Sequence, residues 1–294
     1  MSPQLVAQNL VFGLFVGSNY GLAAVGLSLV FGVLRVLNVA HGELLMVGGY
    51  VTFWLFTLTG LDPFLSALVC APVLFVLGLA LNYGLFGFVE RLDEETKIKN
   101  SLLISFGLTL VIQNAAQALW SADERSVSSS LVAGGTVVMG IALPYTRLAG
   151  LILALLTIVA LHQLLQRTYF GKAVRATAED WEAASVAGID VQRTYLITFA
   201  LGAALAGVAG TLVSIQYSIA PAVGIAWTLK ALVVVVLAGL GSIFGAFAAG
   251  LVLGIAEQIS VFILGAAYRE VVGLVLFLLV LVLRPQGLFG SRAR

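Results

Sequence analysis

The sequence predicts an all-α fold, a polytopic bundle of membrane-spanning helices. Hydrophobic residues make up 61% of the 294 positions and charged residues only 10%, and the mean hydropathy is +1.08. An ordinary soluble domain is roughly 25% charged and about half apolar. A soluble globule of this size cannot hide so much apolar surface, because much of its accessible area still faces water. The chain therefore suits a lipid bilayer.

The apolar residues gather in runs long enough to cross a bilayer. A spanning helix needs about 20 mostly apolar residues, and a helix satisfies its own backbone polar groups in lipid. In chain order the runs are 5–34, 44–61, 64–89, 101–120, 148–166, 194–217, 227–264 and 268–283. The run 227–264 is nearly two spans long and is interrupted at residues 238–242 (AGLGS), so it predicts two helices. We expect a single transmembrane domain over 1–294, with eight or nine segments, in which 35–61 is either a full span or re-entrant.

The basic residues predict the orientation in the membrane. Ten of the fifteen lie in the loops 90–100 and 167–193 or in the tail after the last run, namely Arg91, Lys97, Lys99, Arg167, Lys172, Arg175, Arg193, Arg284, Arg292 and Arg294. By the positive-inside rule these regions are cytoplasmic. The stretch 121–147 holds only two basic residues and 265–270 only one, so both are predicted to be external. The first of these is rich in Ser, Gly and β-branched residues and predicts a short external loop with a hairpin.

Other classes of protein are excluded by the same composition. A net charge of +1 provides no basic field for nucleic acid. Cys70 is the only cysteine, so an intrachain disulfide or a cysteine metal cluster is excluded, and two distant histidines exclude a multi-histidine metal site. The phosphate-binding pattern GxxxxGK[ST] is absent. We therefore expect no cofactor in this chain, and any ATP to be handled by another chain.

Small residues at helical spacing predict close helix packing. Gly13, Gly17 and Gly21 form one such row, and Gly250 and Gly254 form another. In a bilayer no hydrophobic force drives helices together, and small residues let their backbones approach closely. These rows are expected to be structural.

The loop 167–193 contains a short polar helix candidate, GKAVRATAEDWEAASVAGID at 171–190. Its alanines predict a slim helix, and Gly188 allows a sharp turn into the next span. Two interpretations remain open: a rigid element that docks into a cleft of a partner, or a solvated linker. The residues in question are Arg175, Glu179, Asp180, Glu182, Ala183, Ala184 and Gly188.

Polar side chains between the first two apolar runs form a second candidate site. Arg35, Asn38, His41 and Glu43 stand beside Gly42. Ionisable groups inside a membrane are functional candidates because lipid exposure costs several kcal/mol, and a broken helix is typical of transport pathways. A translocation path or gate and a hydrogen-bonded structural corner are both consistent with the pattern. In the first case Glu43 is the main candidate, and His41 is expected to orient it by a hydrogen bond.

Lys230 and Glu257 lie within the long run at 227–264. If the chain turns at 239–242, both fall at similar depth in an antiparallel helix pair. They either neutralise each other as a structural ion pair, or one of them faces the aqueous path and meets a zwitterionic solute.

Four stretches together resemble a known family. EAAxxxG at 182–188 resembles the coupling-helix motif of bacterial ABC importer permeases. It is accompanied by LNVAHGE at 37–43, by KA at 230–231 with GLGS at 239–242 and GIAE at 254–257, and by the terminal RPQGLFG at 284–290. In this order and combination they resemble the smaller, H-type (LivH-like) permease subunit of branched-chain amino acid ABC importers, over essentially the whole chain.

The resemblance implies a fold, partners and a location. The fold is a type II-like ABC importer permease in the bacterial inner membrane. The partners are a larger homologous permease, two ATP-binding subunits that carry ATP and Mg, and a periplasmic binding protein. The resemblance also implies that 167–193 is the cytoplasmic coupling loop, and it favours a pathway role for 38–43.

Alternatives remain for the function. The solute is a branched-chain amino acid, or in the same importer type urea, an amide or an aromatic acid, because such permeases look alike. A secondary transporter or channel is a second class, but it needs no docking loop. A membrane enzyme needs ionisable residues clustered at one depth, which only Arg35, His41 and Glu43 approach.

Overall fold

The protein is a bundle of long helices with one small β-hairpin. This is a computed structural model, and it describes residues 3–90, 92–127 and 134–290. The α-helices of the described residues are α1 (Pro3–Leu34), α2 (His41–Thr59), α3 (Pro63–Gly84), α4 (Glu94–Trp120), α5 (Tyr145–Arg167), α6 (Tyr169–Glu179), α7 (Trp181–Val186), α8 (Val191–Gln216), α9 (Val223–Ala238), α10 (Ile243–Leu264) and α11 (Arg269–Leu283). Short 3-10 helices cover Phe86–Phe88 and Ala266–Tyr268. The predicted all-α bundle is confirmed.

Eight helices of the described residues are long and apolar enough to cross a membrane. The ninth apolar helix, α9, has only 16 residues and is shorter than a full span. It lies after α8 and ends at the predicted glycine turn, where Gly239 and Gly241 take positive φ values of 99° and 86°. Glycine adopts this conformation without steric cost. The expected division of 227–264 into two helices is therefore confirmed, and the segment count is eight long helices and one short one.

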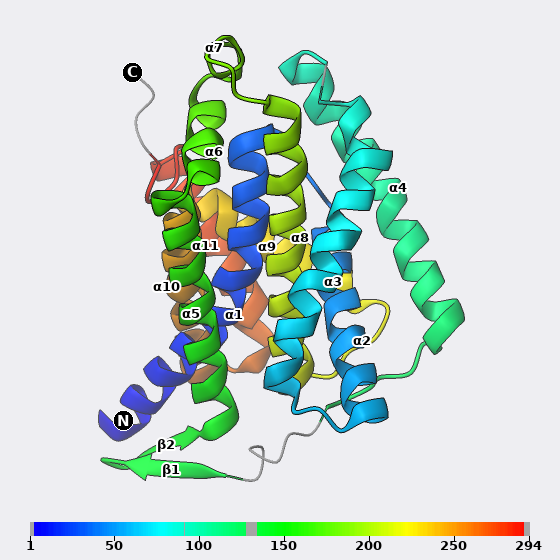
Figure 1. Cartoon of the computed structure of the whole chain (residues 1–294). Coiled ribbons are helices and arrows are strands. Elements are labelled where there is room, and N and C mark those ends of the chain that lie inside the picture. The colour runs from blue at the N-terminus through cyan, green and yellow to red at the C-terminus, as the bar shows by residue number, and fades with distance from the viewer. Residues whose placement is uncertain (1–2, 91, 128–133, 291–294) are drawn as a thin grey trace.

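The two ends of the bundle carry different structures. The N-terminal part of α1 lies at one end beside the β-hairpin, whereas α7 and the adjoining part of α6 protrude from the other (Figure 1). We call these the hairpin end and the α6–α7 end. Three of the basic residues that predicted the orientation, Arg91, Arg292 and Arg294, lie outside the described residues.

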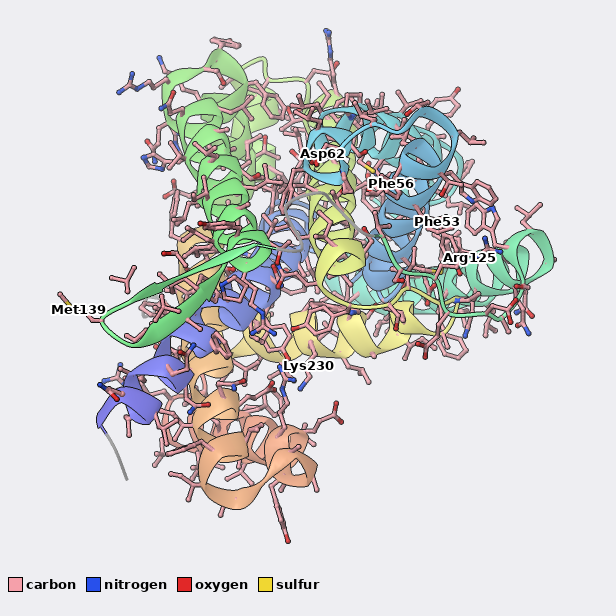
Figure 2. The ribbon with its side chains drawn as sticks, turned by 90° about the horizontal axis from the view of Figure 1, so that it is seen from below. Phe53, Phe56, Asp62, Arg125, Met139 and Lys230 are labelled. Atoms are coloured by element: carbon pink, nitrogen blue, oxygen red, sulfur yellow. The ribbon has the colours of Figure 1, made fainter. Side chains whose placement is uncertain are left out.

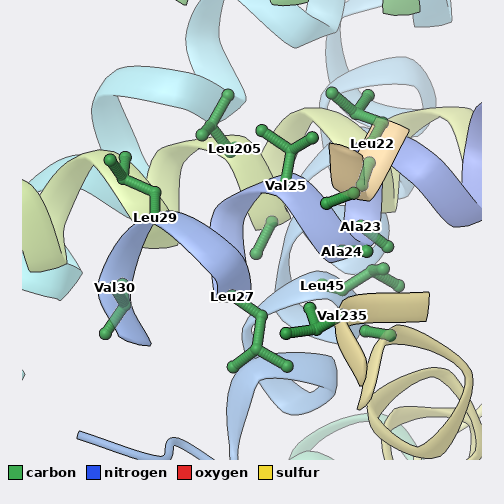
Figure 3. Packing of buried hydrophobic residues seen from close by; sticks show 14 of the residues in the cluster. Leu22, Ala23, Ala24, Val25, Leu27, Leu29, Val30, Leu45, Leu205 and Val235 are labelled. Carbon is green, nitrogen blue, oxygen red and sulfur yellow. The ribbon is translucent and has the colours of Figure 1, made fainter. Parts of the chain in front are cut away.

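The helix α1 forms the centre of the bundle. Its buried side chains lie against α2, α8 and α9, as the close view of Leu27, Leu45, Leu205 and Val235 shows (Figure 3). Towards the hairpin end the predicted glycine row packs against α10. A Cβ atom at Gly17 would stand 2.7 Å from the Gly250 carbonyl oxygen, so the two backbones touch. The small residues replace the side-chain layer that would otherwise separate these helices.

The chain between the first two helices breaks rather than continuing. α1 ends at Leu34, Arg35 takes a φ of 55°, and α2 begins at His41. A positive φ at a residue other than glycine is uncommon, and here it follows directly on the last residue of α1. The region 35–61 is therefore an irregular corner of six residues followed by a 19-residue helix.

The predicted hairpin is present within 121–147. Strands β1 (Gly135–Val138) and β2 (Ile141–Pro144) pair antiparallel, with Val138 opposite Ile141. Met139 and Gly140 join them with φ values of 52° and 82°, which suit a tight two-residue hairpin turn. Met139 projects from the tip (Figure 2), and Gln8 of α1 holds β2 by two hydrogen bonds to Ala142, of 2.9 and 2.7 Å. Residues 128–133 of the predicted loop lie outside the described residues.

Candidate functional sites

The polar loop 167–193 folds as two short helices. α6 ends at Glu179, and Asp180 takes an extended conformation (φ −152°, ψ 104°) before α7 begins. The Asp180 carboxylate accepts hydrogen bonds of 2.9 Å from the backbone N–H groups of Glu182 and Ala183. The expectation of a single helix is therefore wrong, because an aspartate that caps the second helix breaks the first. Gly188 has a φ of 86° and makes the expected turn towards α8.

The tip of this helix pair is exposed. Of the seven residues proposed for docking, six are exposed and only Ala184 is buried. Arg175 donates a hydrogen bond to the Leu165 carbonyl, which fastens α6 to the end of α5. Two apolar residues of α7 also face outwards, Trp181 at 52% and Val186 at 91% exposure. Neither residue belongs to the set that the sequence predicts for docking. The sequence does mark them, because large apolar residues are unusual in so polar a loop.

The corner between α1 and α2 separates Arg35 from its neighbours in the sequence. Arg35 is exposed at the α6–α7 end, where it lines a cavity of 650 Å³ together with Arg175 and Glu179. The other polar residues of the corner are buried in the bundle. Arg35 therefore belongs to the surface of the loop 167–193 and not to the site at membrane depth.

Three residues of the corner and of the start of α2 form hydrogen bonds within the bundle. The Asn38 side chain accepts a hydrogen bond of 3.0 Å from the Ala40 backbone N–H. The His41 ring nitrogen Nε2 lies 2.9 Å from the Ala23 carbonyl of α1. The Gly42 backbone N–H donates to the Thr228 hydroxyl at 2.9 Å, and a Cβ atom at this glycine would clash with α9. The last two contacts attach the start of α2 to α1 and α9, and the first is local to the corner.

Glu43 is different, because its carboxylate is fully buried and both oxygens lack a hydrogen-bond partner among the described residues. The carboxyl group lies against the first turn of α9, so close to Gly224 that a Cβ atom there would overlap it. His41 points elsewhere, so the expected hydrogen bond between them is wrong. Buried polar side-chain atoms in native proteins nearly always have a partner. Among these buried polar residues, Glu43 is therefore the one that can form a further interaction.

Lys230 and Glu257 meet in a buried charge cluster. The Lys230 ammonium lies 2.6 Å from one carboxylate oxygen of Glu257. The Arg269 guanidinium lies 3.0 Å from the other oxygen, to which the Tyr20 hydroxyl also donates at 2.9 Å. Glu257 is fully buried, while the side chains of Lys230 and Arg269 are 22% and 31% exposed. Of the two arrangements that the sequence left open, the structure shows the ion pair, and Figure 2 shows Lys230 between α9 and the helices α10 and α11.

Arg269 and Tyr20 are functional candidates that the sequence analysis missed. Arg269 was counted only as a basic residue of an external turn, and Tyr20 stands within an apolar run. They reach Glu257 from α11 and α1, and Arg269 also donates to the Tyr20 hydroxyl at 3.2 Å. No short-range pattern connects residues 237 positions apart along the chain, so only the packing of α1, α9, α10 and α11 reveals the cluster.

A bundle of apolar spans, with an exposed polar helix pair at one end and charged groups buried at membrane depth, defines a multi-pass membrane transport protein. The chain belongs to the family described as branched-chain amino acid transport system / permease component, whose model matches residues 9–282. It is thus a permease of the inner membrane.

Similar proteins of established name cover nearly the whole chain. The high-affinity branched-chain amino acid transport system permease protein BraD of Pseudomonas aeruginosa is 34% identical over 292 residues, which are 96% of this chain and 95% of that protein. The permease protein LivH of Escherichia coli K12, named for the same type of system, is 34% identical over 99% of this chain and 98% of its own. A probable LivH of Methanocaldococcus jannaschii is 30% identical over 92% and 88%. No solved structure matches the chain.

Proposed function

We propose that this permease is the transmembrane subunit of an ATP-binding-cassette importer for branched-chain amino acids. It moves them across the inner membrane by alternating access. The observation that carries this proposal is the full-length similarity to permeases of branched-chain amino acid systems, combined with an exposed, capped helix pair between α5 and α8. Urea, amides and aromatic acids remain alternative solutes of the same type of importer.

The helix pair α6–α7 supplies the contact with an ATPase. α7 presents exposed Trp181, Glu182, Ala183 and Val186, a surface that combines apolar area with charge. Partly apolar, partly charged patches of this kind suit a protein interface better than continuous exposure to water. The bond from Arg175 to α5 transmits movement of α7 to a spanning helix. ATP-driven closure of the partner subunits would thus rock the bundle.

The partners follow from the same proposal. This chain pairs with a larger homologous permease, two ATP-binding subunits bind at the α6–α7 end, and a periplasmic binding protein delivers the solute at the hairpin end. ATP and Mg are bound by the ATPase subunits. The orientation is supported by the basic residues of 90–100 and 167–193.

The translocation path is assigned to the polar residues at membrane depth. Glu43 is the primary candidate because its buried carboxylate has no hydrogen-bond partner among the residues that the structure describes. His41 and Gly42 position it by fastening the start of α2 to α1 and α9, and Asn38 shapes the preceding corner by its bond to Ala40. The ion pair of Lys230 on α9 and Glu257 on α10 is the second polar site assigned to this path.

The decisive test reverses the charge of Glu182 in the complete transporter reconstituted in vesicles. Glu182→Arg is expected to reduce ATP-dependent uptake at least tenfold while the permease still inserts in the membrane. The matched control is Glu95→Arg at the start of α4, an exposed glutamate that pairs with Lys99 on its own helix. If Glu182→Arg binds the ATPases and transports at the normal rate, the docking assignment is wrong. Uptake by the wild type without ATP would instead indicate a secondary transporter or channel.

A further inference from the structure

A narrow cleft between α9 and α11 lies beside the charge cluster of Glu257. Its volume is 170 Å³, which is room for on the order of ten waters and thus for a small molecule only. Aliphatic side chains form most of its wall, contributed by Leu229, Val233, Leu253 and Leu274. Lys230 and Glu270 also line it, and the carboxyl group of Glu257 closes its inner side.

The two charged groups at the cleft have unused capacity. The Lys230 ammonium has three N–H donors, and Glu257 accepts one of them at 2.6 Å. Glu257 also binds Arg269, so one buried carboxylate is shared by two cations. Glu270 stands in the first turn of α11 and forms no ion pair within 4.0 Å in the described part of the chain. The cleft thus combines a cation that lacks a full counter-charge with a carboxylate that lacks a cation.

The position of Lys230 along α9 argues that the cleft does not face lipid tails. Lys230 lies eight residues before the end of α9, or about 12 Å into the bundle by helical rise. Partly exposed charges at such depth are expensive against hydrocarbon, and they face protein or water instead. The mouth of the cleft therefore opens towards the aqueous path or towards a partner subunit that encloses it.

We propose that this cleft binds the transported solute as an aliphatic zwitterionic amino acid. The solute carboxylate binds Lys230, its ammonium group binds Glu270, and its side chain packs against the four aliphatic residues. Arg269 and Tyr20 act as positioning residues, because they hold the second oxygen of Glu257 and leave Lys230 directed at the cleft. This inference rests on the proposed function and selects among its solutes: urea and amides lack both charges, and simple aromatic acids lack the ammonium group that Glu270 binds.

The proposal is tested by equilibrium binding of labelled L-leucine to the purified transporter complex in lipid nanodiscs, without the binding protein. Two analogues each lack one charge: L-leucinol has no carboxylate, and 4-methylpentanoate has no amine. Lys230→Gln should weaken binding of L-leucine at least tenfold and leave that of leucinol unchanged. Glu270→Gln should weaken binding of L-leucine by a similar factor and leave that of 4-methylpentanoate unchanged. Glu95→Gln is the matched control, because this exposed glutamate at the start of α4 does not line the cleft.

A second variant tests the cleft without removing Lys230, whose loss can also affect the structure. Leu274→Trp fills the cleft from its exposed face on α11 without changing any charge, and it should abolish saturable binding while the complex stays assembled. Equal effects of both charge substitutions on leucine and on both analogues would overturn the proposal. The proposal would also be overturned if the wild-type complex showed no saturable leucine binding but normal ATP-dependent uptake. That result would leave the proposed function intact. Absence of ATP-dependent uptake by the wild type would instead contradict the proposed function itself.

Discussion

Glu257 is predicted to be the most sensitive single polar position for the stability of the bundle. Its carboxylate is fully buried and accepts bonds from Lys230 at 2.6 Å, from Arg269 at 3.0 Å and from Tyr20 at 2.9 Å. In Glu257→Gln one oxygen becomes an amide N–H donor, so at least one cation faces a donor. Breaking a buried ion pair on one side typically costs about 3–5 kcal/mol. Because both cations are partly exposed, we expect a cost near the lower limit, about 3 kcal/mol.

The assay is the free energy of unfolding of the purified permease in mixed micelles with increasing denaturing detergent. Tyr20→Phe removes a hydrogen bond to a charged group and should cost about 1.5–3 kcal/mol. Ser260→Ala is the matched control on the same helix, since it removes only the 2.7 Å bond to the Glu257 backbone carbonyl, and should cost about 1 kcal/mol.

A double-mutant cycle separates the ion pair from general damage. If Glu257 and Arg269 interact as the geometry indicates, Glu257→Gln combined with Arg269→Gln should cost less than the sum of the two single variants by about 1–3 kcal/mol. Strict additivity, together with a cost below 1 kcal/mol for Glu257→Gln, would refute the view that these charges hold the four helices together.

Further predictions address topology, packing and the corner. A reporter fused after Gly188 should be cytoplasmic and one within 126–135 periplasmic; a periplasmic signal at Gly188 would contradict both the orientation and the coupling role. Gly254→Leu should destabilise the bundle by at least about 1–3 kcal/mol, because a Cβ atom there would lie 2.4 Å from the Gly17 backbone; unchanged unfolding would show that α1 and α10 do not touch. Glu43→Gln should lower uptake while assembly and basal ATPase activity persist, whereas His41→Ala, which removes a bond to α1, should also lower stability. If both variants merely fail to assemble, Glu43 is structural.

Much of the site could be predicted from sequence because its signals are local. The apolar runs, the glycine turn after α9 and the polar insertion between α5 and α8 each occupy one continuous stretch. The pairing of Lys230 with Glu257 was also predictable, since a turn of known position places both at similar depth. The break at Asp180 was missed because a capping aspartate and a charged helix-surface aspartate are identical in sequence.

By itself the sequence determined that this chain is a membrane bundle with a polar loop between two spans. The reason is that a spanning helix needs a continuous apolar run and must satisfy its own backbone hydrogen bonds in lipid. Only the tertiary structure decided how the polar residues divide. Arg35 lies at the surface, His41 has a backbone partner on α1, and Glu43 has no hydrogen-bond partner in the described part of the chain. The tertiary structure also brought Tyr20 and Arg269 to Glu257. The physical reason is that a side chain at membrane depth acquires its role from the helices it meets. The close approach of α1 and α10, for example, depends on glycines that are far apart in the sequence.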